Sequence, residues 1–336
     1  MIPYLIITLS MGRYVKLSIC IILFLFTLFM LKVFMRSNKQ VITLLDGGMG
    51  QELVKRSHKE ITPLWSTQVM IDEPEIVRDL HADYIRAGSR VITLNAYTMT
   101  PERLARDAQI EDFEKLQLAA VSAAVNARTN VGISGVKIAG CLPPLVASYH
   151  PEVAPKYEAM LESFGRIVAI QAPHVDVFLC ETMSSIAEAK AALTAAKKSG
   201  VRVWVSLTIE DNDKSLLRSG EPLSQAITML DEFGADAILL NCSKPEAIAA
   251  SWSKMQSDHR LTGAYANGFT SIDSLKPGGT VESMTSRSDL GPAAYAEFAL
   301  QWANDGARLI GGCCEVGPAH ITALAKRLTE AGYSVE

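Results

Sequence analysis

The sequence predicts an α/β protein with the architecture of a (β/α)8 TIM barrel, and three observations support that prediction. Eight short apolar segments recur between residues 41 and 336, and helical patterns separate them. Most of the segments lack the polar alternation of a one-sided sheet, which is typical of buried parallel strands. Barrels of this type take about 250 residues, so one barrel domain over residues 41–336 fits better than two domains.

The expected strands span residues 41–46, 91–95, 136–141, 175–181, 201–208, 237–242, 261–267 and 308–313. Several are rich in β-branched residues, such as VITLLD at the first strand and VRVWVSLT at the fifth. An open doubly wound sheet is the competing interpretation. Its G-x-G-x-x-G fingerprint is absent after the first strand, where the sequence DGGMGQEL stands, although that short motif is weak evidence.

The segments between the strands carry signals for helix termini. Pro74 is typical of a first helical turn, and apolar residues follow it at helical spacing. A later helix is expected to begin at the capping box Ser185-x-x-Glu188. Pro292 and Pro318 stand where helices should begin after the seventh and eighth strands. Alternation of strands and helices in this order favours the barrel.

Residues 1–40 differ from the remainder in charge and hydropathy. They hold five basic and no acidic side chains, so the net charge of −4 divides into +5 there and −9 over residues 41–336. An acidic body argues against nucleic-acid binding. The segment LSICIILFLFTLFML, residues 17–31, is apolar and reaches residue 35 only by including Lys32. This length is borderline for a membrane span, which needs about 17 to 25 residues.

Three interpretations of this leader compete: a membrane anchor through residues 17–35, a signal peptide, and a stretch upstream of a true start at Met30 or Met35. The signal peptide is the weakest because no small-residue cleavage site follows. As an anchor, the segment would leave the barrel in the cytoplasm, since more basic residues follow it than precede it. Six scattered cysteines also favour a reducing compartment over a disulfide scaffold. We expect residues 1–40 to stand outside the fold and the chemistry.

Functional residues of a barrel lie at the carboxyl ends of its strands and in the loops that follow. Those positions hold Asp46, Asn95, Cys141, Glu181, Asn241, Cys242, Asn267, Cys313 and Cys314. A single buried cysteine is most often a small core residue, and we assign that role to Cys141 and Cys180. A lone carboxylate at a strand end is often a helix cap or an ion-pair partner, so these residues gain meaning only as a group.

The adjacent cysteines in RLIGGCCEVGP, residues 308–318, predict a metal site. Neighbouring cysteines form only a strained disulfide. Both can bind one metal where the backbone turns sharply, and Gly311 and Gly312 supply conformational freedom and allow close approach. Cys242 would provide a third thiolate at the same rim. Three soft thiolates suit Zn²⁺, and the lack of a fourth protein ligand at short spacing indicates a catalytic site.

Four segments, LLDGGMGQEL, LCET, LLNCS and RLIGGCCEVGPAHI, occur in this order and resemble the homocysteine S-methyltransferase family over residues 41–330. Members of that family are zinc-dependent barrels that transfer a methyl group to the sulfur of homocysteine. The resemblance implies that Cys242, Cys313 and Cys314 are the zinc ligands. A coordinated thiol is deprotonated outright, so the metal prepares the substrate thiol for attack on the methyl group.

The same resemblance implies how homocysteine is bound. Asp46 and Glu181 would hold its amino group, because a primary ammonium donates three hydrogen bonds. Gly47 and the following loop would lie near its carboxylate. In the second strand, Leu94 and Ala96 stand where relatives often carry hydroxyl residues. The carboxylate is therefore expected to use Asn95, Thr98 or backbone amides.

The resemblance to the short family members implies S-methylmethionine or S-adenosylmethionine as the methyl donor, and we favour S-methylmethionine. The chain ends 22 residues after Cys314, which leaves no room for folate and cobalamin modules or for the extension of betaine-using relatives. Alternatives are a methyltransferase of this fold with another thiol acceptor or a betaine-type donor, and a non-catalytic zinc-binding barrel on a membrane tether. A thiol redox protein with a Cys313–Cys314 disulfide is a further alternative, which predicts no metal and a free Cys242.

Overall fold

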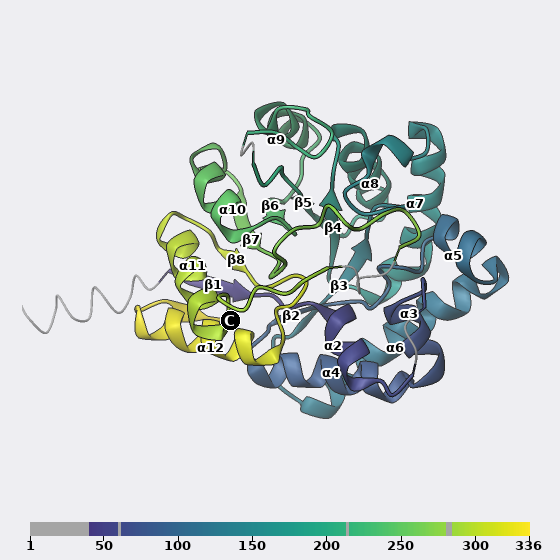
Figure 1. The fold of residues 1–336 in the computed structure, drawn as a ribbon, viewed down its shortest axis with the longest axis horizontal. Helices are drawn as coiled ribbons and strands as arrows, with labels where there is room; N and C mark the ends of the chain where they lie inside the picture. Colours follow the sequence, from purple (N-terminus) through teal and green to yellow (C-terminus); the bar gives the residue numbers. More distant parts are fainter. Residues whose placement is uncertain (1–39, 60–61, 213–214, 280–283) are drawn as a thin grey trace, which may run out of the picture.

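Parallel strands form the wall of a barrel in the computed structural model, which describes residues 40–59, 62–212, 215–279 and 284–336 (Figure 1). The strands of the wall are β1 (Val41–Leu44), β2 (Val91–Thr93), β3 (Lys137–Leu142), β4 (Val177–Met183), β5 (Arg202–Leu207), β6 (Ala237–Asn241), β7 (Leu261–Tyr265) and β8 (Leu309–Ile310). All eight predicted strands are present. The predicted leader lies outside the described residues, apart from Gln40.

The strands follow one another around the wall in chain order, and each pairs in parallel with its neighbour. β8 pairs with β1 through Thr43 and Leu309, and a parallel bridge between Leu45 and Val91 joins β1 to β2. This bridge closes the barrel. The (β/α)8 prediction is therefore confirmed, and the doubly wound alternative is wrong, because its strand order would reverse at a switch point.

A further strand, β9 (Ser334–Val335), was not predicted. It pairs in parallel with Val41 and Ile42 at the start of β1. Two residues are too few to show a periodic pattern, so the pairing follows from the position of the last helix and could not be deduced from local sequence. β9 covers the amino-terminal half of β1, while the carboxyl-terminal half leads to the site described below.

Helices surround the wall (Figure 1). They are α2 (Met49–Arg56), α3 (Ser66–Asp72), α4 (Pro74–Ala87), α5 (Pro101–Asp107), α6 (Phe113–Val131), α7 (Tyr157–Gln171), α8 (Ile186–Lys197), α9 (Leu223–Glu232), α10 (Pro245–Ser251), α11 (Pro292–Asn304) and α12 (Pro318–Glu330). Short 3₁₀ helices lie at Ile110–Asp112, Pro151–Val153, Ala172–His174 and Trp252–Lys254. In the part of the chain that the structure describes, no helix is long and apolar enough to cross a membrane.

The predicted helix starts are correct. Pro74, Pro292 and Pro318 are the first residues of α4, α11 and α12, where a missing N–H costs no hydrogen bond. At the start of α8, the Ser185 hydroxyl accepts a hydrogen bond from the Glu188 amide at 3.2 Å and donates one to the Glu188 carboxylate at 2.9 Å. The Ser185 cap fixes where α8 begins after β4.

Two apolar clusters stabilise the barrel. The larger one lies between the wall and the helices. The smaller one fills the inside of the barrel, with Leu179, Trp204, Leu239 and Leu309 among its members. Because side chains fill the interior, the barrel is not a channel, and the carboxyl ends of the strands are where a barrel of this type binds ligands.

Candidate metal and substrate site

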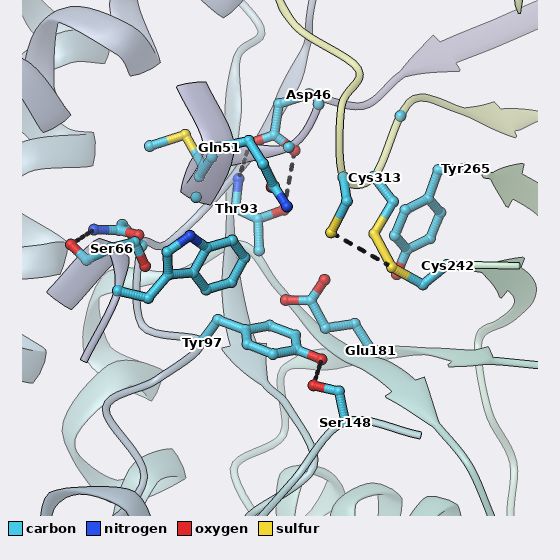
Figure 2. Close-up of a pocket in the computed structure, with 18 of the residues that line it drawn as sticks. Asp46, Gln51, Ser66, Thr93, Tyr97, Ser148, Glu181, Cys242, Tyr265 and Cys313 are labelled. Carbon is cyan, nitrogen blue, oxygen red and sulfur yellow. Dashed lines mark hydrogen bonds between the residues drawn. A yellow bond between two sulfur atoms is a disulfide. The ribbon is translucent and has the colours of Figure 1, made fainter. Parts of the chain in front are cut away.

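A pocket opens at the carboxyl ends of the strands and encloses about 840 Å³, part of which is open to solvent. Its wall includes Asp46 after β1, Glu181 in β4, Cys242 after β6, and Cys313 and Cys314 after β8. Figure 2 shows the Glu181 carboxylate between the Tyr97 ring and the Cys242–Cys313 pair, with Asp46 on the far side of Thr93. Residues far apart in the sequence therefore meet at one rim, as the barrel predicts.

The three cysteine sulfurs of this rim form a compact group, which we call the thiol cluster: Cys242, Cys313 and Cys314. Their Sγ atoms all lie within 4.8 Å of one another. The Cys242 and Cys314 sulfurs are 4.0 Å apart. Such a group has the spacing and softness that suit Zn²⁺. Within the described residues, no other group of three histidine, cysteine or acidic side chains has metal-binding spacing.

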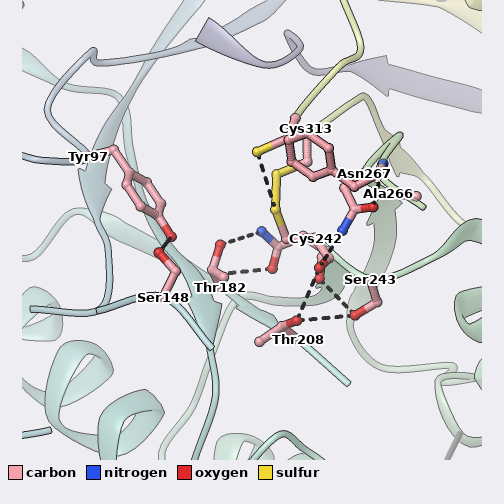
Figure 3. Close-up of a disulfide and its surroundings, with 12 residues drawn as sticks. Tyr97, Ser148, Thr182, Thr208, Cys242, Ser243, Ala266, Asn267 and Cys313 are labelled. Atoms are coloured by element: carbon pink, nitrogen blue, oxygen red, sulfur yellow. Dashed lines mark hydrogen bonds between the residues drawn. A yellow bond between two sulfur atoms is a disulfide. The ribbon is translucent and has the colours of Figure 1, made fainter. Parts of the chain in front are cut away.

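Cys242 and Cys313 are joined in the structure as a disulfide (Figure 3). The sequence predicts three zinc-bound thiolates, and that ligand set stays a prediction. The observed bond differs from the redox alternative, which predicted a Cys313–Cys314 bond and a free Cys242. The Cα atoms of Cys242 and Cys313 are 5.7 Å apart, within the range that disulfides prefer, whereas adjacent cysteines form only strained rings. Metal binding by all three sulfurs requires reduction of this bond.

Main-chain contacts hold the thiol cluster. The Cys313 amide donates to the Ala266 carbonyl at 2.9 Å, and the Gly312 amide donates to the Asp46 carbonyl at 2.9 Å. A side chain at Gly312 would overlap Val316, and one at Gly311 would lie 2.6 Å from the Leu45 Cβ atom. Neither glycine has a positive φ. Close approach, rather than unusual backbone freedom, is therefore the reason for the two glycines.

The acidic side chains of the rim, which we call the carboxylate pair, are Asp46 and Glu181. Asp46 accepts hydrogen bonds from the Thr93 amide at 2.7 Å and the Thr93 hydroxyl at 3.2 Å. Glu181 accepts one from the Cys141 thiol at 3.0 Å. Burial raises the pKa of Asp46 to about 8 and that of Glu181 to about 7. Neither carboxylate makes an ion pair within the described residues, so both lack a cation.

Asn241 connects the two groups across the inside of the barrel. Its side-chain oxygen accepts from the Thr182 amide at 3.0 Å, and its side-chain nitrogen donates to the Thr182 hydroxyl at 2.9 Å. Asn241 directly precedes Cys242, and Thr182 directly follows Glu181. The Asn-Cys sequence therefore links the backbone beside Glu181 to the backbone beside Cys242.

The remaining predicted residues lie at the same rim. Gly47 lines the pocket, and a side chain there would lie 2.9 Å from the Tyr84 ring. Asn95 also lines it; its nitrogen donates to the Ser66 carbonyl at 3.2 Å, and its oxygen has no partner within the described residues. Thr98 donates to the Leu64 carbonyl at 2.8 Å and is not among the lining residues. Of the side chains considered for the substrate carboxylate, Asn95 is the one that reaches the pocket.

The sequence did not predict several polar and aromatic residues of the pocket. Gln51 in α2 is 5% exposed, lines the pocket, and has no hydrogen-bond partner for either amide atom within the described residues. Burial raises the pKa of Cys314 to about 12. The nearby Gln51 amide opposes part of that rise, although no hydrogen bond joins the two side chains. The aromatic side chains are Trp65, Tyr97, Tyr149 and Tyr265. Most of these residues lie in loops or helices after strands, where no periodic pattern marks them.

The backbone is unusual at the same rim. Five described residues other than glycine have a positive φ: Trp65, Tyr149, Thr182, Cys242 and Glu315. Three of them line the pocket, and the other two directly follow pocket residues. Such conformations cost about 1 to 3 kcal/mol each and persist only where the surrounding structure imposes them. Their concentration here indicates that this rim is shaped for chemistry rather than for stability.

Known proteins resemble this chain over nearly the whole barrel. The family model described as homocysteine S-methyltransferase matches residues 43–328. The homocysteine S-methyltransferase of Escherichia coli is 30% identical over 311 residues, which covers 86% of this chain and 96% of the relative. The crystal structure of the Escherichia coli homocysteine methyltransferase MmuM in its metallated form has a TM-score of 0.72 and 27% identity, and covers 86% of this chain and 97% of that one. The oxidized form of the same protein has a TM-score of 0.71 with 27% identity, and covers 85% of this chain and 96% of that one.

Proposed function

The chain belongs to the homocysteine S-methyltransferase family, and from that membership we propose that it transfers a methyl group from a sulfonium donor to homocysteine, giving methionine. The observation that carries this proposal is the meeting of two chemically different groups in one pocket. Three sulfurs lie within 4.8 Å of one another, and the same cavity is lined by the buried Asp46 and the partly buried Glu181, which make no ion pair within the described residues. Homocysteine presents a thiol and an ammonium, which match these two groups.

The thiol cluster fits a zinc ion. After reduction of the Cys242–Cys313 bond, Cys242, Cys313 and Cys314 offer three soft ligands and leave a fourth position for the substrate. A zinc ion held by these residues would favour the deprotonated substrate thiol, which is the nucleophilic form. Gly311 and Gly312 allow the chain that leads to Cys313 to pass close to Leu45 and Val316.

The carboxylate pair binds the ammonium of homocysteine. Without a cation, burial raises the pKa of both Asp46 and Glu181, which opposes their ionisation. A bound ammonium favours the ionised forms of both side chains, because its positive charge balances their negative charge inside the pocket. A thiol without an amino group gains none of this interaction. The pair therefore selects amino-acid thiols over simple ones.

The aromatic side chains of the pocket suit a cationic methyl donor. Trp65, Tyr97 and Tyr149 line the cavity, and Trp65 and Tyr97 pack edge to face with ring centroids 6.4 Å apart. A sulfonium cation is attracted to the faces of such rings. In the transfer, the homocysteine sulfur forms a bond to the methyl carbon, and the bond from that carbon to the donor sulfur breaks. Its electron pair stays on the donor, which leaves as a neutral thioether.

We favour S-methylmethionine as the donor over S-adenosylmethionine and betaine-type donors. The test uses reduced protein loaded with one zinc per chain, homocysteine, and each donor in turn, with methionine measured by mass spectrometry. The highest kcat/KM is expected with S-methylmethionine. Zinc-loaded protein that forms no methionine with any donor would contradict the proposal. Turnover of another thiol at a higher kcat/KM than homocysteine would support the other acceptor considered above.

We assign the activity to residues 41–336 and give residues 1–40 no part in it. A shortened chain that begins at Met35 is expected to fold and keep its full kcat/KM, because β1 starts at Val41. Loss of folding on this truncation would show that the leader packs against the barrel.

A further inference from the structure

Cys141, at the end of β3, is placed differently from an ordinary core cysteine. The sequence assigned it the role of a small buried residue, and it is indeed only 1% exposed. Its Sγ atom, however, donates a hydrogen bond to Oε1 of Glu181 at 3.0 Å. Cys141 is not a lining residue of the pocket. It therefore contacts the Glu181 carboxylate without lining the cavity.

A chain of buried amides fixes the position of Cys141. The Gln171 side-chain oxygen accepts from the Cys141 amide at 2.9 Å, and its nitrogen donates to the Gln117 side-chain oxygen at 2.7 Å. The Gln117 nitrogen in turn donates to the Met99 carbonyl at 2.8 Å. Gln117 and Gln171 are at most 1% exposed. Helices α6 and α7 thus hold the end of β3 in place through satisfied polar contacts, which an apolar core would not need.

The thiol is the only hydrogen-bond donor that reaches the Glu181 carboxylate within the described residues. Burial raises the pKa of Cys141 well above its usual value, so the thiol keeps its proton and remains a donor. Burial also raises the pKa of Glu181, and the hydrogen bond from Cys141 opposes that rise. Without this donor, the carboxylate would lose both an orientation and a stabilising contact for its charge.

We propose that Cys141 is a positioning residue, whose thiol holds the Glu181 carboxylate in the orientation that binds the ammonium of homocysteine. This inference rests on the proposed function and extends it to a residue outside the pocket. Cys141 contacts no substrate and acts through Glu181 alone. Its substitution should therefore change recognition of the amino group and leave the metal and the substrate sulfur unaffected.

The chain offers a matched control. Cys180 is the neighbouring buried cysteine, 0% exposed, and it packs in the cluster between wall and helices without a hydrogen bond to Glu181. Cys141→Ala, Cys141→Ser and Cys180→Ala are compared as zinc-loaded proteins by titration calorimetry with homocysteine. Cys141→Ala is expected to bind homocysteine about five- to tenfold more weakly, as loss of one hydrogen bond of about 1 to 1.5 kcal/mol implies. Cys141→Ser keeps a donor and Cys180→Ala removes no contact with Glu181, so both should bind homocysteine within about twofold of the parent.

Two further measurements make the test specific. A thiol that lacks the amino group should bind parent and Cys141→Ala equally, and Cys141→Ala should add little to the loss in Glu181→Gln. The infrared S–H stretching band that disappears in Cys141→Ala should lie at a lower frequency than that of a free thiol, and should shift in Glu181→Gln. Equal homocysteine affinity in parent and Cys141→Ala would overturn the proposal. An S–H stretching frequency that is the same in the parent and in Glu181→Gln would also overturn it.

The infrared band also separates this inference from the proposed function. If the parent binds no homocysteine but the S–H band responds to Glu181→Gln, the thiol contact stands and the assignment of the acceptor is wrong, which overturns the ammonium role of Cys141. If the parent binds homocysteine and the band does not respond, the acceptor stands and the positioning role is wrong.

Discussion

The thiol cluster and the carboxylate pair face the same pocket but are held in different ways. Main-chain hydrogen bonds and close backbone approach hold Cys313, and Cys242 has a φ of 49°. Side-chain and amide donors hold Asp46 and Glu181, through Thr93 and Cys141. The sulfurs thus depend on the shape of the backbone, and the carboxylates depend on polar partners. Substitutions near the first group should change metal binding, and those near the second should change recognition of charge.

The largest effect is expected within the thiol cluster itself. Cys314→Ala leaves two sulfurs for the metal and removes the open three-thiolate arrangement. We expect this variant to lose both stoichiometric zinc and methyl transfer, measured after reduction by elemental analysis and by methionine formation. Cys180→Ala, which removes a buried cysteine outside the cluster, should retain both. Full zinc retention in Cys314→Ala would remove Cys314 from the ligand set.

The next effect concerns the carboxylate pair. Glu181→Gln keeps the shape of the side chain and removes its charge, so zinc content should be unchanged. Loss of a charge-assisted hydrogen bond of about 1.5 to 3 kcal/mol corresponds to roughly ten- to hundredfold weaker homocysteine binding. Calorimetry on zinc-loaded protein measures this loss. A variant that loses zinc would show that the two groups are not separate, and unchanged affinity would remove Glu181 from ammonium binding.

A smaller effect tests whether backbone shape holds the sulfurs. In Gly312→Ala the new methyl group overlaps Val316, and such overpacking costs about 1 to 3 kcal/mol. Zinc affinity, measured by competition with a chelator, should fall together with the free energy of unfolding. Gly291→Ala is the control, because a side chain there has no atom within 4 Å. Equal zinc affinity in the two variants would show that the cluster tolerates movement of its backbone.

A separate effect, on stability rather than on binding, concerns Glu188, a buried carboxylate outside the pocket. Burial raises its pKa from 4.5 to about 7, so the folded state holds its proton more tightly than the unfolded state does. Its contribution to the free energy of unfolding is complete below about pH 4.5 and is lost as the pH rises through about 7. Glu188→Gln should therefore show a smaller fall in stability between pH 5 and pH 8 than the parent, measured by urea denaturation, roughly as one shifted group predicts. Identical slopes would contradict the shift.

The barrel and the thiol cluster could be predicted because their signals are local or specific. Eight apolar segments give the strands, and adjacent cysteines after two glycines admit few structural explanations. Asp46 and Glu181 followed only from the family resemblance, because a lone acid at a strand end has several structural uses. The contact of Cys141 with Glu181 joins two strands, and the disulfide of Cys242 joins two others. Pairings of this kind depend on which side chains face each other, which spacing along the chain does not encode.

The pairing between β1 and β2 is where we expect the barrel wall to open most readily. These strands share a single bridge, Leu45 to Val91, whereas every other neighbouring pair around the described wall has at least two register positions. The Asp46 carboxylate strengthens this join by accepting the Thr93 amide at 2.7 Å. One side chain thus takes part both in closing the wall and in lining the pocket. The rate at which the Thr93 amide proton exchanges with heavy water therefore measures local opening of the barrel between β1 and β2. A ligand in the pocket that binds Asp46 should change this exchange rate.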